Sequence, residues 1–142
     1  MTIKAILQAK GDAVTAIART ATVAEAVALL AQHRIGAVPV LDGEDVVGIF
    51  SERDVIHALA EHGASALERA VGDVMTAPAI TVTRDEAALG ALSLMTRRRI
   101  RHLPVVEEGR MIGLISIGDL VKYRIDRIEA DAEAMRTYIQ AS

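Results

Sequence analysis

Two short segments of this sequence carry the same polar residues at the same spacing. Residues 48–54 read GIFSERD and residues 113–119 read GLISIGD, so both follow the pattern Gly-x-x-Ser-x-x-Asp. A Ser followed three residues later by an acid is typical of a capped helix start, where free backbone N–H groups also attract phosphate. The Asp could accept hydrogen bonds from two ribose hydroxyls, and the Gly would let a base approach closely. One copy alone fits either a simple helix cap or a ribonucleotide site.

A tandem duplication explains why the motif occurs twice. A shift of 65 positions aligns residues 17–54 with 82–119 without a gap, and ten of these 38 pairs are identical. The identical pairs include Pro39 with Pro104 as well as the Gly, Ser and Asp of the motif. Neither copy could bury a three-stranded sheet alone, so we expect both to pack together as one α+β module.

Each copy has the pattern of a strand, a helix, two strands and a second helix. The first copy predicts a strand at 16–20, a helix at 22–34, two strands within 36–50 and a helix at 51–63. The second predicts the same elements at 81–85, 86–99, 101–115 and 116–125. Thr22 and Glu25 offer a capping box, and the prolines predict edge strands or strand starts.

Segments outside the duplication complete the expected organisation. Residues 1–70 are assigned to the first repeat with a leading helix and a connector, 71–125 to the second repeat, and 126–142 to a C-terminal amphipathic helix. Ile128, Ala132, Met135 and Ile139 fall on one face of that helix, which predicts docking on the body or on a partner subunit.

Composition removes several classes of function. The 142 residues include no Cys, which excludes disulfides, thiolate nucleophiles and iron–sulfur sites. The net charge of −3 and the 2% aromatic content argue against nucleic-acid binding. The sequence has no signal-peptide pattern and no long apolar run, so we expect a cytoplasmic protein without membrane attachment. The four His lack metal-ligand spacing, and we expect neither a required metal nor enzymatic activity.

The two strand–Pro segments IGAVPVLDG and IRHLPVVEEG, together with GIFSERD and GLISIGD, make the chain resemble a stand-alone pair of CBS repeats, also called a Bateman module. The resemblance covers roughly residues 1–125. It implies two repeats packed about a pseudo-two-fold axis, with two clefts for adenine ligands such as AMP, ATP, NAD(H) or S-adenosylmethionine. It also implies that the Asp holds the ribose, that the Ser lies near ribose or phosphate, and that the backbone before the strand Pro meets base or phosphates. The candidate ligand-binding residues are therefore Asp54, Asp119, Ser51, Ser116, Arg53, Arg101, His102, Gly36, Ala37, Val38, Ile17 and Val82.

A basic cluster, RRRIRH at residues 97–102, distinguishes the second repeat from the first. Arg97 and Arg98 suit the solvated end of a helix, where they would favour the helix dipole. Arg101 and His102 enter the strand beside the expected cleft, and the resemblance gives that position to phosphate contacts. Their counterparts in the first repeat are Gly36 and Ala37, so we expect two unequal clefts.

The sequence therefore favours a regulatory module that binds an adenine nucleotide, forms a homodimer and signals to an unidentified downstream protein. A structural dimerisation domain with empty clefts is one alternative. The other is a part of a system like inosine monophosphate dehydrogenase, in which CBS pairs also occur. That enzyme's chemistry resides in a separate barrel with a Cys nucleophile, and this chain has neither.

Overall fold

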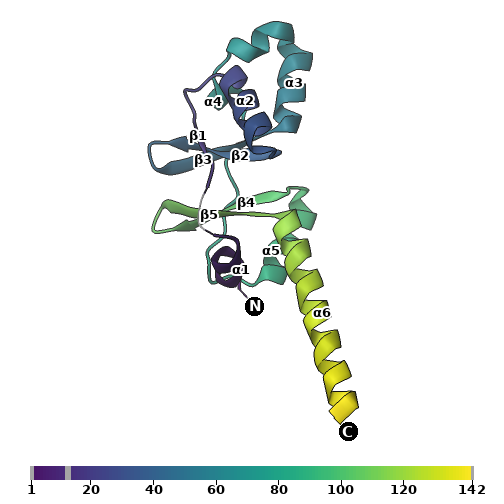
Figure 1. Ribbon diagram of the computed structural model, residues 1–142. Helices are drawn as coiled ribbons and strands as arrows, with labels where there is room; N and C mark the ends of the chain where they lie inside the picture. Colours follow the sequence, from purple (N-terminus) through teal and green to yellow (C-terminus); the bar gives the residue numbers. More distant parts are fainter. Residues whose placement is uncertain (1, 12–13, 142) are drawn as a thin grey trace.

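Two halves of similar build are stacked one on the other, and a long helix projects from the second (Figure 1). The computed structural model describes residues 2–11 and 14–141; positions 1, 12, 13 and 142, which fall within the expected ranges 1–70 and 126–142, lie outside the described residues. The elements in chain order are α1 (Ile3–Lys10), β1 (Ile17–Ala18), α2 (Val23–His33), β2 (Ala37–Asp42), β3 (Asp45–Ser51), α3 (Glu52–His62), the 3₁₀ helix η1 (Gly63–Glu68), α4 (Val71–Val74), α5 (Ala88–Arg98), β4 (His102–Glu107), β5 (Arg110–Ser116) and α6 (Ile117–Ala141). The fold is α+β, as predicted.

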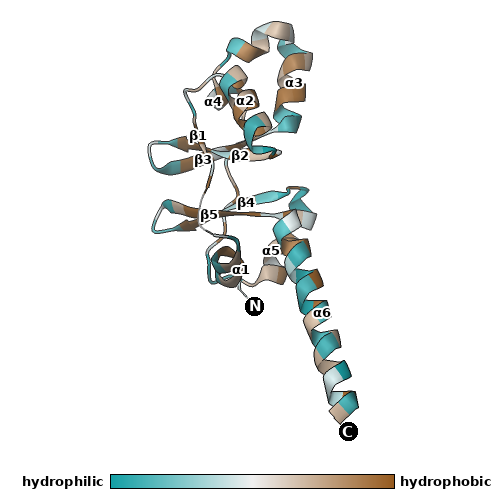
Figure 2. Cartoon of the chain, in the orientation of Figure 1, coloured by the Kyte–Doolittle hydropathy of each residue, from teal (hydrophilic) through white to brown (hydrophobic). Residues whose placement is uncertain are grey.

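The two hairpins show the duplication most clearly. In the first, β2 pairs antiparallel with β3, with Val40 opposite Gly48; in the second, β4 pairs with β5, with Val105 opposite Gly113. The pairing register shifts directly after the residue opposite Gly in both hairpins. Both turns are hydrophilic and lie on the same side of the molecule (Figure 2).

The opening strand of each repeat is shorter than the sequence predicted. Residues 16–20 supply only the two-residue β1, which runs parallel to β2. The strand expected at 81–85 is wrong: this segment contributes a single bridge, between Val82 and Val105, in which Val82 bonds Pro104 and Val106. In both segments a turn follows directly: the Ala21 N–H donates to the Ala18 carbonyl (3.0 Å), and the Glu86 N–H donates to the Thr83 carbonyl (3.3 Å), so the pairing ends there.

Pro104 lies on an edge strand, as predicted, because its sheet consists of β4 and β5, but Pro39 does not, because β2 is the middle strand of the sheet β1–β2–β3. Pro39 nevertheless fits there. Its opposite residue, Ile49, exchanges both backbone hydrogen bonds with Thr76 (2.9 Å each) and none with Pro39. The pairing with β1 begins only at Val40, so the missing N–H of Pro39 leaves no gap in the sheet.

Each half has its own apolar core, and the two halves exchange short helices. Ile3 and Ile6 of α1 are buried in the core of the second repeat, with Met95, Leu103 and Ile115 at its centre. Conversely, Val71 of α4 is buried in the core of the first repeat. The expected boundary between residues 70 and 71 divides the chain by sequence order. The packing differs from it, because α1 precedes the first repeat but packs on the second core, and α4 follows the boundary but packs on the first core.

The C-terminal segment is one helix with the second repeat's last element. α6 runs without a break from Ile117 to Ala141, and Leu120 near its start is 3% exposed. Every residue from 124 to 141 is exposed, and the helix leaves the body (Figure 1). Of the two expected docking places, the body is therefore wrong for residues 126–141, because α6 continues straight from an anchored first turn. Docking on a partner stays a prediction.

The two motif glycines differ in what surrounds them, which predicts unequal costs of substitution. A Cβ at Gly48 would lie 2.6 Å from Met75 Sδ and 2.7 Å from the backbone oxygen of Thr76, which is held by its bonds to Ile49. The atoms nearest to a Cβ at Gly113 would belong to the end of the flexible Leu7 side chain, the closest at 2.6 Å. We expect Gly48→Ala to lower the free energy of unfolding by about 2–3 kcal/mol and Gly113→Ala by about 1 kcal/mol or less.

Urea unfolding followed by circular dichroism would measure both changes. Gly90→Ala is the control, because Gly90 lies within α5 with open space around it, and Ala should raise the free energy of unfolding by about 0.5–1 kcal/mol. Equal losses at Gly48 and Gly113 would contradict the difference in packing.

Candidate functional site

The first predicted site lies where β3 ends and α3 begins. Asp54 is buried, at 9% exposed, and its Oδ2 accepts from the backbone N–H of Ser51 (2.9 Å) and from Ser51 Oγ (3.1 Å). Ser51 Oγ in turn accepts from the Asp54 N–H (3.4 Å), which completes a capping box. Thr76 Oγ1 donates to Asp54 Oδ1 (2.9 Å). The simple cap predicted from the sequence is therefore present, and Thr76 extends it.

The second predicted site, at the start of α6, has the same cap but a different third partner. Asp119 Oδ2 accepts from the Ser116 N–H (2.9 Å), and Ser116 Oγ accepts from the Asp119 N–H (3.1 Å). Lys10 Nζ donates to Asp119 Oδ2 (2.7 Å) and to the backbone oxygen of Leu114 (2.7 Å). Burial raises the pKa of the Asp119 carboxyl, but the bonds from Lys10 and Ser116 outweigh it and hold that pKa below its ordinary value.

Lys10 and Thr76 come from corresponding places in the two repeats. Each lies in the segment that leads into the first strand of one repeat, and each contacts the Asp of the other repeat. A shift of 65 pairs Lys10 with Met75 and Gly11 with Thr76, so the two partners are neighbours in the alignment but differ in chemistry. Asp54 therefore accepts a hydrogen bond from a hydroxyl group, and Asp119 accepts one from an ammonium group.

The strand starts before Pro39 and Pro104 lie against these caps. Ala37 is paired with Ser51, and His102 with Ser116. The carbonyl of Gly36 accepts from the Glu52 N–H (3.0 Å), and the carbonyl of Arg101 accepts from the Ile117 N–H (2.8 Å). The structure thus brings the predicted Gly36–Ala37 segment to Ser51 and Asp54, and Arg101–His102 to Ser116 and Asp119.

The remaining predicted residues differ in how exposed their side chains are, and so in whether a ligand could contact them. Arg53 and Arg101 are exposed at the two sites. The side chains of Val38 and Val82 are buried in the two cores, at 0% and 3% exposed, so only their backbone is available. Ile17 is half-buried beside Val40 on the short β1, and packs against the first core.

His102 responds to charges from both halves of the molecule. Burial and then the positive charge of Lys10 lower the pKa of His102 below its ordinary value; Asp119 acts in the opposite direction, Arg101 adds to the lowering, and Glu52 opposes it. His102 is therefore neutral at pH 7, and it can offer a phosphate an N–H group but no charge. Because Glu52 belongs to the first repeat, a charge at the start of α3 acts on a residue of the second repeat.

Sequence reasoning missed Lys10, Thr76 and the influence of Glu52. The duplication holds a signal for the first two, because the same shift extended backwards aligns residues 3–11 with 68–76 and pairs Lys4 with Arg69 and Ile6 with Val71. That extension marks α1 and α4 as equivalent helices. It does not reveal that each packs on the other repeat's core.

Two open grooves lie outside the caps. One, of about 590 Å³, is mostly apolar and runs between α2 and α3, lined by Val27, Leu30, Ala31, Arg34, Ile35, Glu52, Val55 and Ile56. The other, of about 440 Å³, lies beside α1 and includes the Arg84–Glu107 ion pair (3.0 Å). Among the described residues, neither lining includes the two Ser–Asp pairs.

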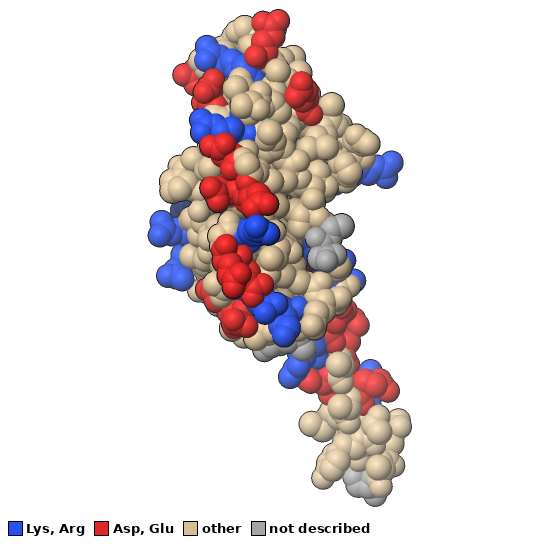
Figure 3. Space-filling model, turned by 90° about the vertical axis from the view of Figure 1, so that its left-hand side faces the viewer, with Lys and Arg blue, Asp and Glu red and all other residues tan. Residues whose placement is uncertain are grey.

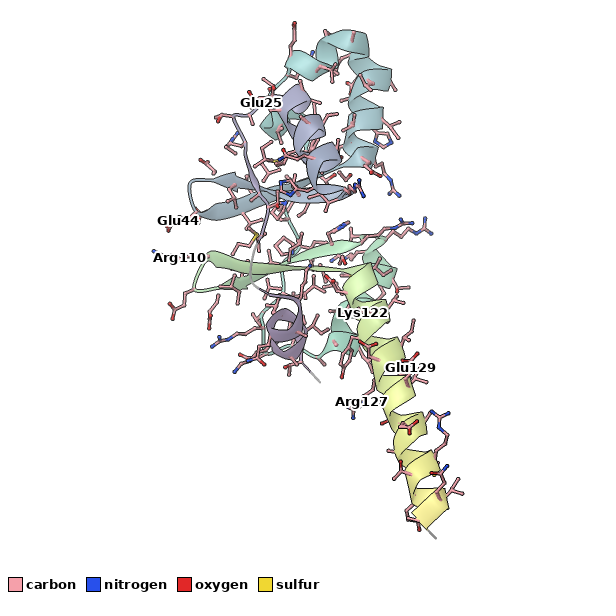
Figure 4. All side chains as sticks on the ribbon, in the orientation of Figure 1. Glu25, Glu44, Arg110, Lys122, Arg127 and Glu129 are labelled. Carbon is pink, nitrogen blue, oxygen red and sulfur yellow. The ribbon has the colours of Figure 1, made fainter. Side chains whose placement is uncertain are left out.

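Charges elsewhere on the surface are mixed in sign. Figure 3 shows acidic and basic side chains interspersed over one face of the body. Glu44, on the first hairpin turn, and Arg110, the first residue of β5, form an ion pair between the halves (3.2 Å; Figure 4). Within residues 2–11 and 14–141, no group of three or more His, Asp or Glu is placed to hold a metal ion, and no helix is long and apolar enough to cross a membrane.

Comparison with known proteins identifies the family. The profile of the CBS domain matches residues 11–61 and 71–126, which correspond to the two repeats. The chain belongs to the CBS-domain family and contains a pair of CBS domains.

The relatives include small proteins built around such a pair. A mitochondrial CBS-domain protein of Arabidopsis thaliana, CBSX3, is 38% identical over 124 residues, and the match covers 84% of this chain and 60% of that protein. The chain thus spans less than two thirds of this curated relative. The solved CBS-domain protein ATU1752 of Agrobacterium tumefaciens is 39% identical with a TM-score of 0.83, over 87% of this chain and 99% of that one.

Two solved CBS pairs with lower identity contain adenosine derivatives. CBSX2 in complex with AMP is 25% identical with a TM-score of 0.71, and the match covers 80% of this chain and 88% of that one. The CBS pair of MJ0100, in complex with 5′-methylthioadenosine and S-adenosylmethionine, is 25% identical with a TM-score of 0.76, over 87% of this chain and 98% of that one. An inosine monophosphate dehydrogenase of Methanocaldococcus jannaschii also matches, but over only 20% of its length.

The lowered pKa of Asp119 predicts an acid-dependent contribution to stability. A depressed carboxyl pKa stabilises the fold fully above the unfolded-state pKa of about 4, and this contribution is lost as the pH falls through the lower folded-state value. Asp119→Asn should therefore lower the free energy of unfolding by about 1 kcal/mol at pH 7, with a loss that shrinks below about pH 4.

Denaturant titrations of the wild type and the variant at several pH values would measure this change. Asp126→Asn, on an exposed part of α6, is the control and should show no such dependence. A loss at Asp119→Asn that stays constant down to acidic pH would contradict the proposed charge pairing with Lys10.

Proposed function

We propose that this CBS pair is a regulatory module that binds an adenosine-derived ligand, such as AMP, ATP or NAD(H), at two sites. The observation that carries the proposal is the Ser–Asp pair at the start of both α3 and α6, each beside a Gly-containing strand. The AMP, methylthioadenosine and S-adenosylmethionine complexes of related CBS pairs support this class of ligand.

The carboxylates have room for ribose hydroxyls. A carboxylate offers about four acceptor positions, and Asp54 uses three of them for Ser51 and Thr76. At Asp119, the Lys10 ammonium and the Ser116 N–H both bond Oδ2, so we expect Oδ1 to accept from a ribose. Lys10 then lies beside that ribose as a cation available to a phosphate. The Ser hydroxyls and the backbone of Gly36–Val38 and Arg101–Leu103 complete the proposed contacts.

The proposed module is non-catalytic, needs no metal, and works as a homodimer that signals to an unidentified downstream protein in the cytoplasm. The chain includes no Cys that could act as the nucleophile of a dehydrogenase barrel. A purely structural dimerisation domain with empty clefts is the alternative. A thermal-shift screen separates the two, since a ligand at a hundredfold excess over its Kd adds about 2.7 kcal/mol of stability and an empty module gains nothing.

The ribose assignment predicts that Asp54→Ala and Asp119→Ala each abolish or weaken one site. Each variant removes charge-assisted hydrogen bonds worth about 1.5–3 kcal/mol, which corresponds to roughly tenfold or more in affinity. Calorimetric titration with AMP would measure this loss. Asp126→Ala is the matched control on an exposed helix face.

Part of the loss at Asp54 and Asp119 could come from the cap instead of the ribose. Thermal unfolding of each variant without ligand measures the contribution of the cap separately. Unchanged affinity for AMP in both folded variants would contradict the ribose assignment.

The basic cluster predicts that the two sites bind with different affinities. Arg101 is exposed at the second strand start, where the first repeat has Gly36 and therefore no guanidinium group. We expect the tighter site to depend on phosphate and on salt, and Arg101→Ala to weaken it by roughly tenfold while the other site changes little.

Titrations with AMP and with adenosine at two salt concentrations would test this asymmetry. Arg98→Ala, in the last turn of α5, is the control within the same cluster. Equal affinities for adenosine and AMP, or no effect of Arg101→Ala on either site, would contradict it.

A further inference from the structure

The projecting part of α6 extends away from the body of the molecule (Figure 1). Residues 124–141 are all exposed, whereas Leu120 near the start of the helix is 3% exposed. Helices in proteins draw most of their stability from packing of an apolar face. Exposed apolar side chains on α6 are nevertheless large: Val121 (47%), Ile125 (49%), Ile128 (53%), Met135 (58%) and Ile139 (63%).

These apolar residues have the spacing of a coiled-coil seam. With Ala132 included, the positions 121, 125, 128, 132, 135 and 139 follow intervals of four and three residues in strict alternation. The average of 3.5 residues is the period at which two helices wind around each other in a left-handed supercoil. Val121, Ile128 and Met135 then take position d of the heptad, and Ile125, Ala132 and Ile139 take position a.

The seam is separate from the face that holds α6 to the body. Ile117, Leu120 and Tyr123 pack against the core of the second repeat. At about 100° per residue, the seam lies roughly a quarter-turn around the helix from Leu120. A second helix can therefore lie along the seam while Leu120 stays in the core.

The charges beside the seam determine which orientation of a second α6 fits. In a parallel pair, the residue at position g of one helix faces position e of the next heptad on the other helix. Arg124 then faces the partner's Glu129, and Asp131 faces the partner's Arg136, so both contacts are attractive. In an antiparallel pair with the same seam, Lys122 would face the partner's Arg136, and Glu129 and Asp131 would each face their own copy. Only the parallel pair joins opposite charges.

The ion pairs within α6 are compatible with this arrangement. Arg136 contacts Glu133 (2.7 Å) and Arg127 contacts Asp131 (3.9 Å), and all four side chains are more than half exposed. Exposed pairs of this kind contribute little and are readily shared with another charge. Arg136 and Asp131 remain accessible to a partner helix.

We propose that α6 pairs with α6 of a second copy of this chain as a parallel, in-register, two-stranded coiled coil. This inference goes beyond ligand binding and does not depend on it. The two bodies then lie at the same end of the coiled coil, with their second repeats adjacent.

Substitution of one seam residue tests the surface. Ile128→Asp places two charges in the centre of the seam and should weaken the dimer roughly a hundredfold or more, so that light scattering reports a monomer. The matched control is Ala130→Asp on the outer face, which should remain a dimer. Because Ile128 is exposed in the single chain, far-UV circular dichroism and the thermal midpoint of the body should stay close to those of the control.

A single introduced Cys tests the orientation, because the chain has no Cys of its own. Ile139→Cys should form an intersubunit disulfide under mild oxidation, since equivalent a positions of a parallel pair are close enough. Ala130→Cys should not. In the antiparallel pair, residue 139 would lie opposite residue 121, too far from its copy to cross-link.

Three results would overturn the proposal. The first is a monomeric or trimeric wild type at concentrations well above micromolar. The second is an Ile128→Asp variant that stays fully dimeric, which would place the dimer contact elsewhere. The third is a dimer in which Ile139→Cys does not cross-link. AMP titration of the Ile128→Asp monomer separates this outcome from the proposed function, because the Ser–Asp sites lie on the body and should still bind.

Discussion

The reciprocal hydrogen bonds between Ser and Asp at the strand-to-helix junction are the interaction on which the rest of this structure depends. They bind the end of β3 to the start of α3, and the end of β5 to the start of α6. The same carboxylates accept hydrogen bonds from Thr76 and Lys10. Each of these two residues lies in the segment that leads into one repeat and bonds the Asp of the other. One short motif therefore fixes the local turn, the helix cap and the contact between the two repeats.

The carboxylates also explain why the two repeats diverge in chemistry while they keep the same backbone. Asp54 is buried and satisfied by neutral donors, whereas Asp119 is paired with an ammonium group that lowers its pKa. At the strand starts, Gly36 faces one junction and Arg101 the other. The side chains that differ surround the residues that are identical, which is the pattern expected when one scaffold forms two sites of unequal charge.

Much of this fold was readable from the sequence because its signals are local. The capping residues, the strand-to-helix turns and the 65-residue offset each depend on spacing along the chain. The two hairpins and the helices α2, α3 and α5 lie where the pattern placed them, whereas η1 and α4 were not predicted. The repeat offset marks the segments that contain Lys10 and Thr76 as equivalent, but it does not show that either residue bonds the Asp of the other repeat. Their roles arise from the packing of α1 and α4 on opposite cores, a long-range choice between two similar apolar surfaces. The edge-strand expectation for Pro39 failed for a related reason: the proline's fit depends on Thr76 pairing with Ile49, and that contact lies 27 positions along the chain.

α6 continues without a break from the junction at Asp119, so any rotation of its first turn also rotates the whole helix. Its 25 residues extend about 37 Å at 1.5 Å per residue, and its fulcrum is the turn where Ser116, Asp119 and Lys10 meet. A tilt of about 5° at that turn displaces the far end by about 3 Å, because a straight helix amplifies rotation in proportion to its length. A change at the half-buried Asp119 carboxylate that tilts α6 would therefore move the far end of the helix, outside the body, where another molecule can contact it.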